Sequence, residues 1–392
     1  MDPRTNPYSP GAGSPPPELA GRDDLIERAA ISIDRIRNGL ATKSLLMVGL
    51  RGVGKTVLLN RIRLDADARG ISTVFIEAPE RKSLPALLSG PVRAALLKLD
   101  RIQNAGDKAK RALRVLGGLI KAAKFEYTDV EFHFDLGSEP GLGDTGDLDN
   151  DLGDLLQAIG EAASERRTAF AIFIDELQYV EEEQLAALIT ALHRCAQSKL
   201  PVTLIGAGLP QLIGNMGKAK SYAERLFDFP SVGPLSEEAG KAAIVVPARK
   251  LGIEYQDEAV RMILADTQAY PYFLQEWGKH SWDVASGSPI TEKNVDDARR
   301  SALVELDMSF FRVRFDRLTP AEKRYLRAMA NLGPGSHRSG DIATDLQVTV
   351  QSVAPTRSSL IAKGMIYSPS HGETAFTVPL FDEFMKRAMP HE

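Results

Sequence analysis

The chain has 392 residues, of which 43% are hydrophobic and 26% charged, and its formal net charge is -4. This length predicts two or three domains with hydrophobic cores of their own. The near-neutral charge excludes a protein that coats nucleic acid with a basic surface over its whole length. The one cysteine, Cys195, excludes an internal disulfide framework and is typical of a reducing compartment. Its helical spacing from Leu188 and Leu192 predicts a core position.

The N-terminal segment is rich in proline and poor in apolar side chains. We expect residues 1–18 to form a disordered leader, because such a composition buries too little apolar surface to fold. The segment lacks the apolar core of a signal peptide. Elsewhere no apolar run approaches the roughly 20 residues that span a bilayer. The sequence therefore predicts a cytoplasmic protein with no membrane partner.

Short apolar runs alternate with amphipathic segments from residue 23 to residue 208. Helices are predicted at 23–37, 57–69, 84–99, 148–164 and 181–197, and strands at 44–48, 73–76, 170–174 and 202–205. Strands that alternate with helices are typical of a parallel sheet covered on both faces. We expect a three-layer α/β core over residues 19–235.

A complete G-x-x-x-x-G-K-T motif follows the first predicted strand and opens a helix. In such a phosphate loop the backbone N–H groups and the helix N-terminus bind phosphate. The lysine reaches the β- and γ-phosphates, and the hydroxyl of the last residue is a ligand of Mg²⁺. The predicted nucleotide-binding residues are Gly49, Leu50, Arg51, Gly52, Val53, Gly54, Lys55, Thr56 and Val57.

A second motif, Asp175-Glu176, follows the apolar run at 170–174. An apolar strand places Asp175 at its C-terminal tip, where it can hold Mg²⁺ opposite Thr56. Glu176 can polarise the attacking water as a general base. Together the two motifs predict hydrolysis of a nucleoside triphosphate with Mg²⁺ as well as its binding. We find no Asn/Thr-Lys-x-Asp motif for guanine.

A charged insert is predicted at about 98–154, with a basic first half and an acidic second half. Phe132-His133-Phe134 suggests a short strand, and a loop is expected at 137–146. The insert is either a partner surface or a solvated excursion from the core, since charge runs are usually solvated.

The two motifs and the stretch Leu19-Ala20-Gly21-Arg22-Asp23-Asp24-Leu25 resemble those of AAA+ P-loop ATPases. The resemblance covers roughly residues 18–390 and is to the origin-recognition/initiator-like and STAND-related branches. It implies that the stretch at Leu19 helps to cradle adenine. It also makes 200–208 the sensor-1 strand, although Gly206-Ala207-Gly208 lacks the usual polar side chain.

The same resemblance marks two further site residues. Arg225, in Glu224-Arg225-Leu226-Phe227, resembles an arginine that reaches the γ-phosphate bound by a neighbouring subunit; a local ion pair is the alternative. Pro271 resembles the proline of a Gly-x-Pro motif that packs near adenine, although Ala269 replaces the glycine. Pro271 can equally be a helix-start proline.

The remaining residues predict two more domains. Residues 236–312 have an entirely helical pattern, which indicates a helical lid. Residues 313–392 contain three short helices and two strands, which resemble a winged helix-turn-helix. If this domain binds double-stranded DNA, the helix at 349–363 enters the major groove with Arg357, and Lys363 lies near phosphate.

These observations predict an ATP-hydrolysing switch of the AAA+ type that couples its nucleotide state to DNA binding through the winged helix. Alternatively, the chain is a STAND-like signalling ATPase whose winged helix and charged insert bind proteins, with assembly into homo-oligomers. The catalytic residues are expected to be Glu176, Lys55 and Arg225, and the metal ligands Thr56 and Asp175.

Overall fold

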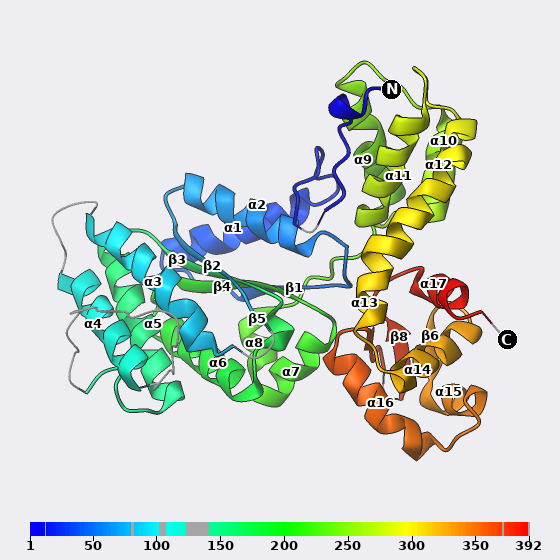
Figure 1. Ribbon diagram of the computed structural model, residues 1–392. Coiled ribbons are helices and arrows are strands. Elements are labelled where there is room, and N and C mark those ends of the chain that lie inside the picture. The colour runs from blue at the N-terminus through cyan, green and yellow to red at the C-terminus, as the bar shows by residue number, and fades with distance from the viewer. Residues whose placement is uncertain (12, 80–81, 102–106, 123–140, 371, 391–392) are drawn as a thin grey trace. The chain divides into compact units, whose positions relative to one another are not determined.

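The computed structural model describes residues 1–11, 13–79, 82–101, 107–122, 141–370 and 372–390 (Figure 1). The chain divides into two compact units, which are described separately. The first contains Met1–Gly21, Leu50–Gly54 and Val232–Glu392, and the second contains Arg22–Gly49 and Lys55–Ser231. Of the phosphate loop, Leu50–Gly54 are grouped with the first unit, and Gly49 and Lys55 with the second.

The second unit is built on a five-stranded parallel sheet in the order β2-β3-β4-β1-β5. Its strands are β1 (Ser44–Val48), β2 (Ser72–Glu77), β3 (Phe170–Asp175), β4 (Val202–Gly208) and β5 (Phe227–Asp228). Strand β4 lies between β1 and β3, with Val48 paired to Gly208 and Ile174 paired to Gly206. The carboxyl ends of these three strands therefore meet at one edge of the sheet.

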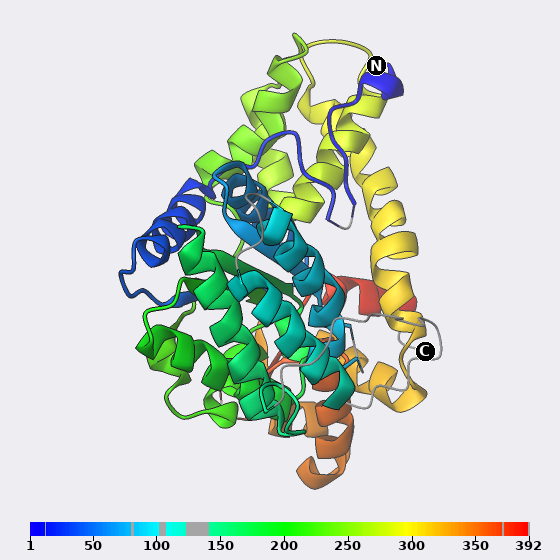
Figure 2. The same ribbon diagram turned by 90° about the vertical axis from the view of Figure 1, so that its left-hand side faces the viewer.

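Helices cover both faces of this sheet (Figure 1). α1 (Asp23–Arg37) and α2 (Lys55–Ala68) lie on one face. α3 (Leu84–Arg101), α4 (Asp107–Ala122), α5 (Leu148–Glu165) and α6 (Glu182–Gln197) lie on the other, and run from cyan to green in Figure 2. Between β4 and β5 the chain forms α7 (Gln211–Ala219) and α8 (Ala223–Leu226).

The central strands are buried on both faces, as their uninterrupted apolar runs predict. Leu46, Ile172 and Ile174 belong to one core cluster with the helices α3–α6. Since side chains alternate along a strand, Leu45 and Phe173 face the opposite layer, and both are buried. The expected three-layer α/β core is confirmed.

Of the charged insert, α4 is described, whereas Phe132-His133-Phe134 and the start of the 137–146 loop lie outside the described residues.

The first unit contains the predicted helical region as α9 (Glu237–Arg249), α10 (Asp257–Thr267), α11 (Pro271–Val284) and α12 (Glu292–Glu305). α12 continues through a π-helical turn, Leu306–Phe311, into α13 (Arg312–Asp316). Aromatic rings join these helices: Tyr272 stacks on Phe310 with a centroid distance of 4.5 Å, and Phe311 stacks on Phe384 at 5.3 Å. Among the described helices, none is both long and apolar enough to cross a membrane.

The C-terminal part of this unit contains α14 (Pro320–Asn331), α15 (Ser339–Asp345), α16 (Val350–Ala362) and α17 (Phe381–Ala388). Its strands β6 (Ser336–Arg338), β7 (Ile366–Tyr367) and β8 (Glu373–Phe376) form an antiparallel sheet in the order β6-β8-β7. Two of these strands were expected, and β6 was missed. Thr319 caps α14 in a capping box with Glu322, as the Thr-Pro-Ala-Glu sequence predicts. The winged-helix assignment itself stays a prediction.

The expectation of a disordered leader is wrong for the residues described in this segment. Tyr8 is 4% exposed, and its hydroxyl donates a hydrogen bond to the carbonyl of Ile244. Its ring fills the space beside Gly278, where an added Cβ would lie 2.6 Å from the ring. Asn6 donates to the carbonyl of Lys279 at 3.0 Å. One large aromatic side chain and a few hydrogen bonds thus hold a segment whose average composition indicates disorder.

We predict that Tyr8→Ala releases this segment from the helical region. Truncating a buried aromatic side chain costs about 3 kcal/mol of unfolding free energy. Tyr8→Phe is the control, because it removes only the hydrogen bond to Ile244, worth about 1 kcal/mol. Amide hydrogen exchange of residues 1–11 is the measurement, with protection expected in the wild type and lost in Tyr8→Ala. Rapid exchange of this segment in the wild type would contradict the packing described here.

Candidate functional site

The two predicted phosphate-site motifs meet at the carboxyl edge of the sheet. α2 begins at Lys55, directly after the phosphate loop, and β3 ends at Asp175. The hydroxyl of Thr56 donates a hydrogen bond of 2.6 Å to Oδ2 of Asp175. Residues that are 119 positions apart in the sequence are thereby in direct contact, as the interpretation of the two motifs requires.

Burial shapes the electrostatics of this edge. Asp175 is 2% exposed, and burial raises the pKa of its carboxyl, against hydrogen bonds from Thr56 and from the N–H of Glu176 that lower it. Lys55 is 7% exposed, and its Nζ donates to the carbonyl of Gly49 at 3.0 Å. A cation and a carboxylate are thus held in a largely water-free environment, where their interaction with a charged ligand is strong.

The donor set at this edge fits Mg²⁺. Mg²⁺ prefers oxygen ligands and commonly binds one or two protein groups together with substrate phosphates and water. The hydroxyl of Thr56 and the carboxylate of Asp175 are such a pair. Within the described ranges, no cluster of three or more His, Cys, Asp or Glu side chains could hold a metal without a substrate.

Two glycines of the phosphate loop have left-handed backbone conformations that other residues rarely adopt. Gly52 has φ +82° and Gly54 has φ +87°. An added Cβ at Gly52 would also lie 3.0 Å from Cε1 of Tyr270, whereas one at Gly54 would have no neighbour within 4 Å. Glycine is therefore required at position 54 by the backbone conformation alone. At position 52 it is required both by the backbone conformation and by the packing against Tyr270.

The middle of the loop has hydrogen-bond partners within the first unit. The N–H of Tyr272 donates to the carbonyl of Gly52 at 3.2 Å, and the hydroxyl of Tyr270 donates to the carbonyl of Arg51. The N–H of Arg51 donates to the carbonyl of Thr377 at 3.2 Å. Pro271 is the first residue of α11, which is the alternative that its sequence left open.

Glu176 has a strained backbone. Its φ of 52° and ψ of 36° are left-handed, a conformation that costs a non-glycine residue about 1–3 kcal/mol. Its N–H donates to Oδ1 of Asp175 at 2.9 Å, and its carbonyl accepts from Tyr179 at 3.0 Å. Strain of this kind persists where the surroundings enforce it, and it is concentrated at functional sites.

Gln178 was not among the predicted site residues, and it lies in the 3-10 turn Leu177–Tyr179 after Glu176. Its Nε2 donates to Oε2 of Glu176, and its Oε1 accepts from the N–H of Leu209 at 2.9 Å. It therefore connects the end of β3 to the end of β4. The glutamine two positions after Glu176 was visible in the sequence, but its partner at Leu209 was not.

Arg225 is exposed on α8, and its backbone N–H donates to the carbonyl of Tyr222. Within the described part of the chain its side chain forms no ion pair within 4.0 Å. The described residues therefore do not support the alternative that Arg225 forms a local ion pair.

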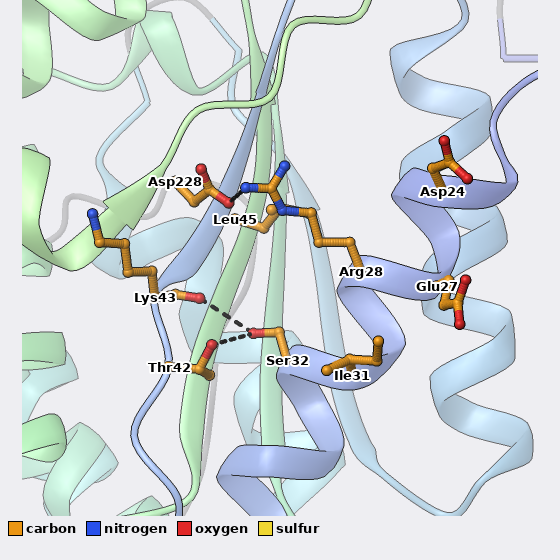
Figure 3. A pocket seen from close by; sticks show the side chains of 9 residues that line it. All are labelled: Asp24, Glu27, Arg28, Ile31, Ser32, Thr42, Lys43, Leu45 and Asp228. Atoms are coloured by element: carbon orange, nitrogen blue, oxygen red, sulfur yellow. Dashed lines mark hydrogen bonds and ion pairs between the residues drawn. The ribbon is translucent and has the colours of Figure 1, made fainter.

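One pocket of about 400 Å³ lies between α1 and the β1–β5 edge of the sheet (Figure 3). Arg28 is paired with Asp228, and the hydroxyl of Ser32 donates to the carbonyl of Lys43 at 3.2 Å. Lys55, Thr56 and Asp175 do not line this pocket. It is therefore distinct from the phosphate-site motifs, and its charged side chains largely neutralise one another.

Comparison with known families gives two matches. Residues 18–205 match the AAA ATPase domain, and residues 308–385 match a domain of unknown function, DUF8462. No curated protein matches the chain.

Among solved structures, the chain is similar to the Walker-type ATPase PABY2304 of Pyrococcus abyssi. The two are 14% identical with a TM-score of 0.60, over 94% of this chain and 96% of the other. Orc1 of Aeropyrum pernix in complex with DNA is 14% identical with a TM-score of 0.46, over 94% of this chain and 93% of that chain. RuvB of Thermotoga maritima, a Holliday junction branch migration motor, is 14% identical with a TM-score of 0.43, over 95% and 96%.

At 14% identity, the likeness to the Pyrococcus ATPase shows the fold alone. The fold agrees with the family match over the residues that contain both motifs. The chain is therefore an AAA+ P-loop ATPase in fold, and its residues 18–205 belong to the AAA ATPase domain family.

Proposed function

We propose that this chain binds ATP with Mg²⁺ and hydrolyses it at the edge where β1, β3 and β4 end. The observation that carries the proposal is the 2.6 Å contact between Thr56 and Asp175. That contact joins a phosphate loop to a carboxylate that follows a buried strand, which is the arrangement that phosphoryl transfer requires.

Each residue has a role in this proposal. The backbone N–H groups at the α2 end of the loop, residues 54–57, and the Lys55 ammonium bind the phosphates. Bound Mg²⁺, held by Thr56 and Asp175, would neutralise charge that develops on the phosphate oxygens. The Glu176 carboxylate orients the attacking water and accepts its proton. Pro271 would pack near the adenine of the bound ATP.

Arg225 supports a further part of the proposal, namely assembly into homo-oligomers. An exposed arginine whose side chain has no described ion-pair partner can reach a nucleotide bound by another subunit. Such an arginine stabilises the charge that develops at the γ-phosphate. Hydrolysis would then depend on assembly.

For the C-terminal domain, the residue contacts favour a protein partner over duplex DNA. Arg357 donates to Oγ1 of Thr374 at 2.9 Å, and Lys363 pairs with Glu322 at 2.8 Å. These two basic side chains, which were expected to face DNA, have partners inside the domain. The prediction that they form the DNA-binding face is therefore not supported.

The exposed residues of α16 and of the turn before it are all uncharged: Gln347, Val348, Thr349, Val350, Gln351, Ser352, Ala354, Pro355, Ser358 and Ala362. Duplex recognition depends on cations that neutralise phosphates, so this helix face is poorly suited to it. We therefore propose an ATP-controlled switch with a core at 19–235, a lid at 236–312 and a winged helix at 313–392 that contacts protein. Loss of the γ-phosphate would shift the lid relative to the winged helix.

We predict opposite outcomes for two variants of the phosphate site. Lys55→Ala should abolish ATP binding, because it removes the cation that contacts the phosphates. Glu176→Gln should bind ATP normally and lower turnover by about 10²- to 10⁴-fold, the usual contribution of a general base. Equilibrium binding of a fluorescent ATP analogue and steady-state phosphate release are the measurements. Normal turnover in Glu176→Gln would place the general base elsewhere.

Subunit mixing tests the role of Arg225. Arg225→Ala alone should lower turnover by about 10³-fold in the assembled protein. Mixed with Glu176→Gln, which keeps the arginine but lacks the base, it should regain measurable turnover, because each subunit supplies what the other lacks. Wild-type turnover in Arg225→Ala would show that the arginine has no such role.

Titration with duplex DNA separates the two candidate partners. We expect only weak, sequence-independent binding of the ATP-bound chain, with a Kd of about 10⁻⁴–10⁻⁶ M at physiological salt. The ADP-bound chain is the matched comparison. A sequence-dependent Kd of about 10⁻⁸ M or tighter with ATP would instead establish DNA as the partner.

A further inference from the structure

Gln178 is buried, and its side-chain amide forms one hydrogen bond at each end. It is 8% exposed. The N–H of Leu209 can only donate, so the atom that faces it is the oxygen Oε1, at 2.9 Å. The amide nitrogen then faces Glu176 and donates to its Oε2. The orientation of the amide is thus set by the backbone at the end of β4.

The end of β4 has no room for a polar side chain of its own. An added Cβ at Gly208 would lie 2.8 Å from Oε1 of Gln178 and 2.8 Å from Cδ2 of Leu212. An added Cβ at Gly206 would lie 2.7 Å from Cδ2 of Leu46. Contacts this short force neighbouring atoms to move. Gln178 therefore occupies the space that a side chain at position 208 would need.

We propose that Gln178 is a positioning residue, which holds the Glu176 carboxylate in place from the end of β4. In this chain the polar group at the β4 tip comes from the turn after β3, which explains why Gly206-Ala207-Gly208 carries none. The inference rests on the proposed hydrolysis of ATP at Glu176. Any displacement of the backbone at Leu209, where β4 leads towards α7, would be transmitted to Glu176 through this amide.

Two substitutions at this position separate positioning from simple support of the fold. Gln178→Glu keeps an oxygen that accepts from Leu209, but it loses the donor to Glu176 and places two carboxylates together. Gln178→Met has a similar length and loses both hydrogen bonds. If Gln178 only supports the turn at Leu209, Gln178→Glu retains wild-type turnover.

The chain offers a matched control in Gln184. Its Oε1 accepts from the N–H of Leu84 at 2.6 Å, and its Nε2 donates to Glu181 at 3.3 Å. The bonding pattern is that of Gln178, but neither of these two partners is a phosphate-site residue. Gln184→Glu should therefore leave turnover unchanged.

Steady-state kinetics of the full chain give the first test. Gln178→Glu should lower kcat by about 10- to 100-fold, the effect of misplacing a reacting group. KM and the affinity for a fluorescent ATP analogue should stay within about twofold, because the phosphate loop is untouched. Wild-type kcat in Gln178→Glu, or an equal loss in Gln184→Glu, would overturn the proposal.

The exchange variant Glu176→Gln with Gln178→Glu covers the case in which Gln178→Glu fails to fold. It pairs an amide with a carboxylate again, so it should regain the wild-type melting temperature and ATP affinity without turnover. A melting temperature as low as that of Gln178→Glu alone would show that residues 176 and 178 are not coupled.

Crystal structures separate failure of this inference from failure of the proposed function. The wild type and Gln178→Met would be crystallised with Mg²⁺ and a non-hydrolysable ATP analogue. The Glu176 carboxylate should contact Gln178 in the wild type and turn away in the variant. If the wild type hydrolyses no ATP, the proposed function fails, and this comparison alone decides the role of Gln178. An unchanged Glu176 position in Gln178→Met would overturn it.

Discussion

The parallel pairing of β4 between β1 and β3 is the constraint on which the rest of the site depends. Strands that run in the same direction end at the same edge, so the phosphate loop after β1 and the carboxylates after β3 emerge together. Because β4 lies between them, β1 and β3 are two strand spacings apart, about 9.6 Å. The short side chains of Thr56 and Asp175 are nevertheless in contact at the carboxyl end of β4.

The same arrangement makes the tip of β4 a crowded place. Its two glycines keep the backbone close to Leu46 on one side and to Gln178 on the other. Glu176 is held in a left-handed conformation by neighbours on its own strand end and by Gln178. Strain at a single residue is tolerated because several independent hydrogen bonds oppose its relaxation.

The two motifs and the strands β1 to β4 could be predicted from the sequence, because buried strands leave apolar runs. The two-residue strand β5 was missed, since it is too short to leave such a run. The predicted strand at 44–48 coincides with β1, and the predicted helix at 23–37 with α1. The ordered structure of the N-terminal segment could not be predicted. It depends on one side chain, because Tyr8 packs beside Gly278. The link from Gln178 to Leu209 joins residues 31 positions apart, and no local pattern indicates it.

The buried cysteine has a practical consequence for observing a conformational switch. Cys195 is 0% exposed, and burial raises the pKa of its thiol to about 12, so it stays protonated at neutral pH. The sequence contains one cysteine. A cysteine introduced at an exposed position such as Ser358 would then be the one reactive thiol of the folded chain. A fluorophore or spin label attached there could report nucleotide-dependent changes in its surroundings without first replacing the native residue.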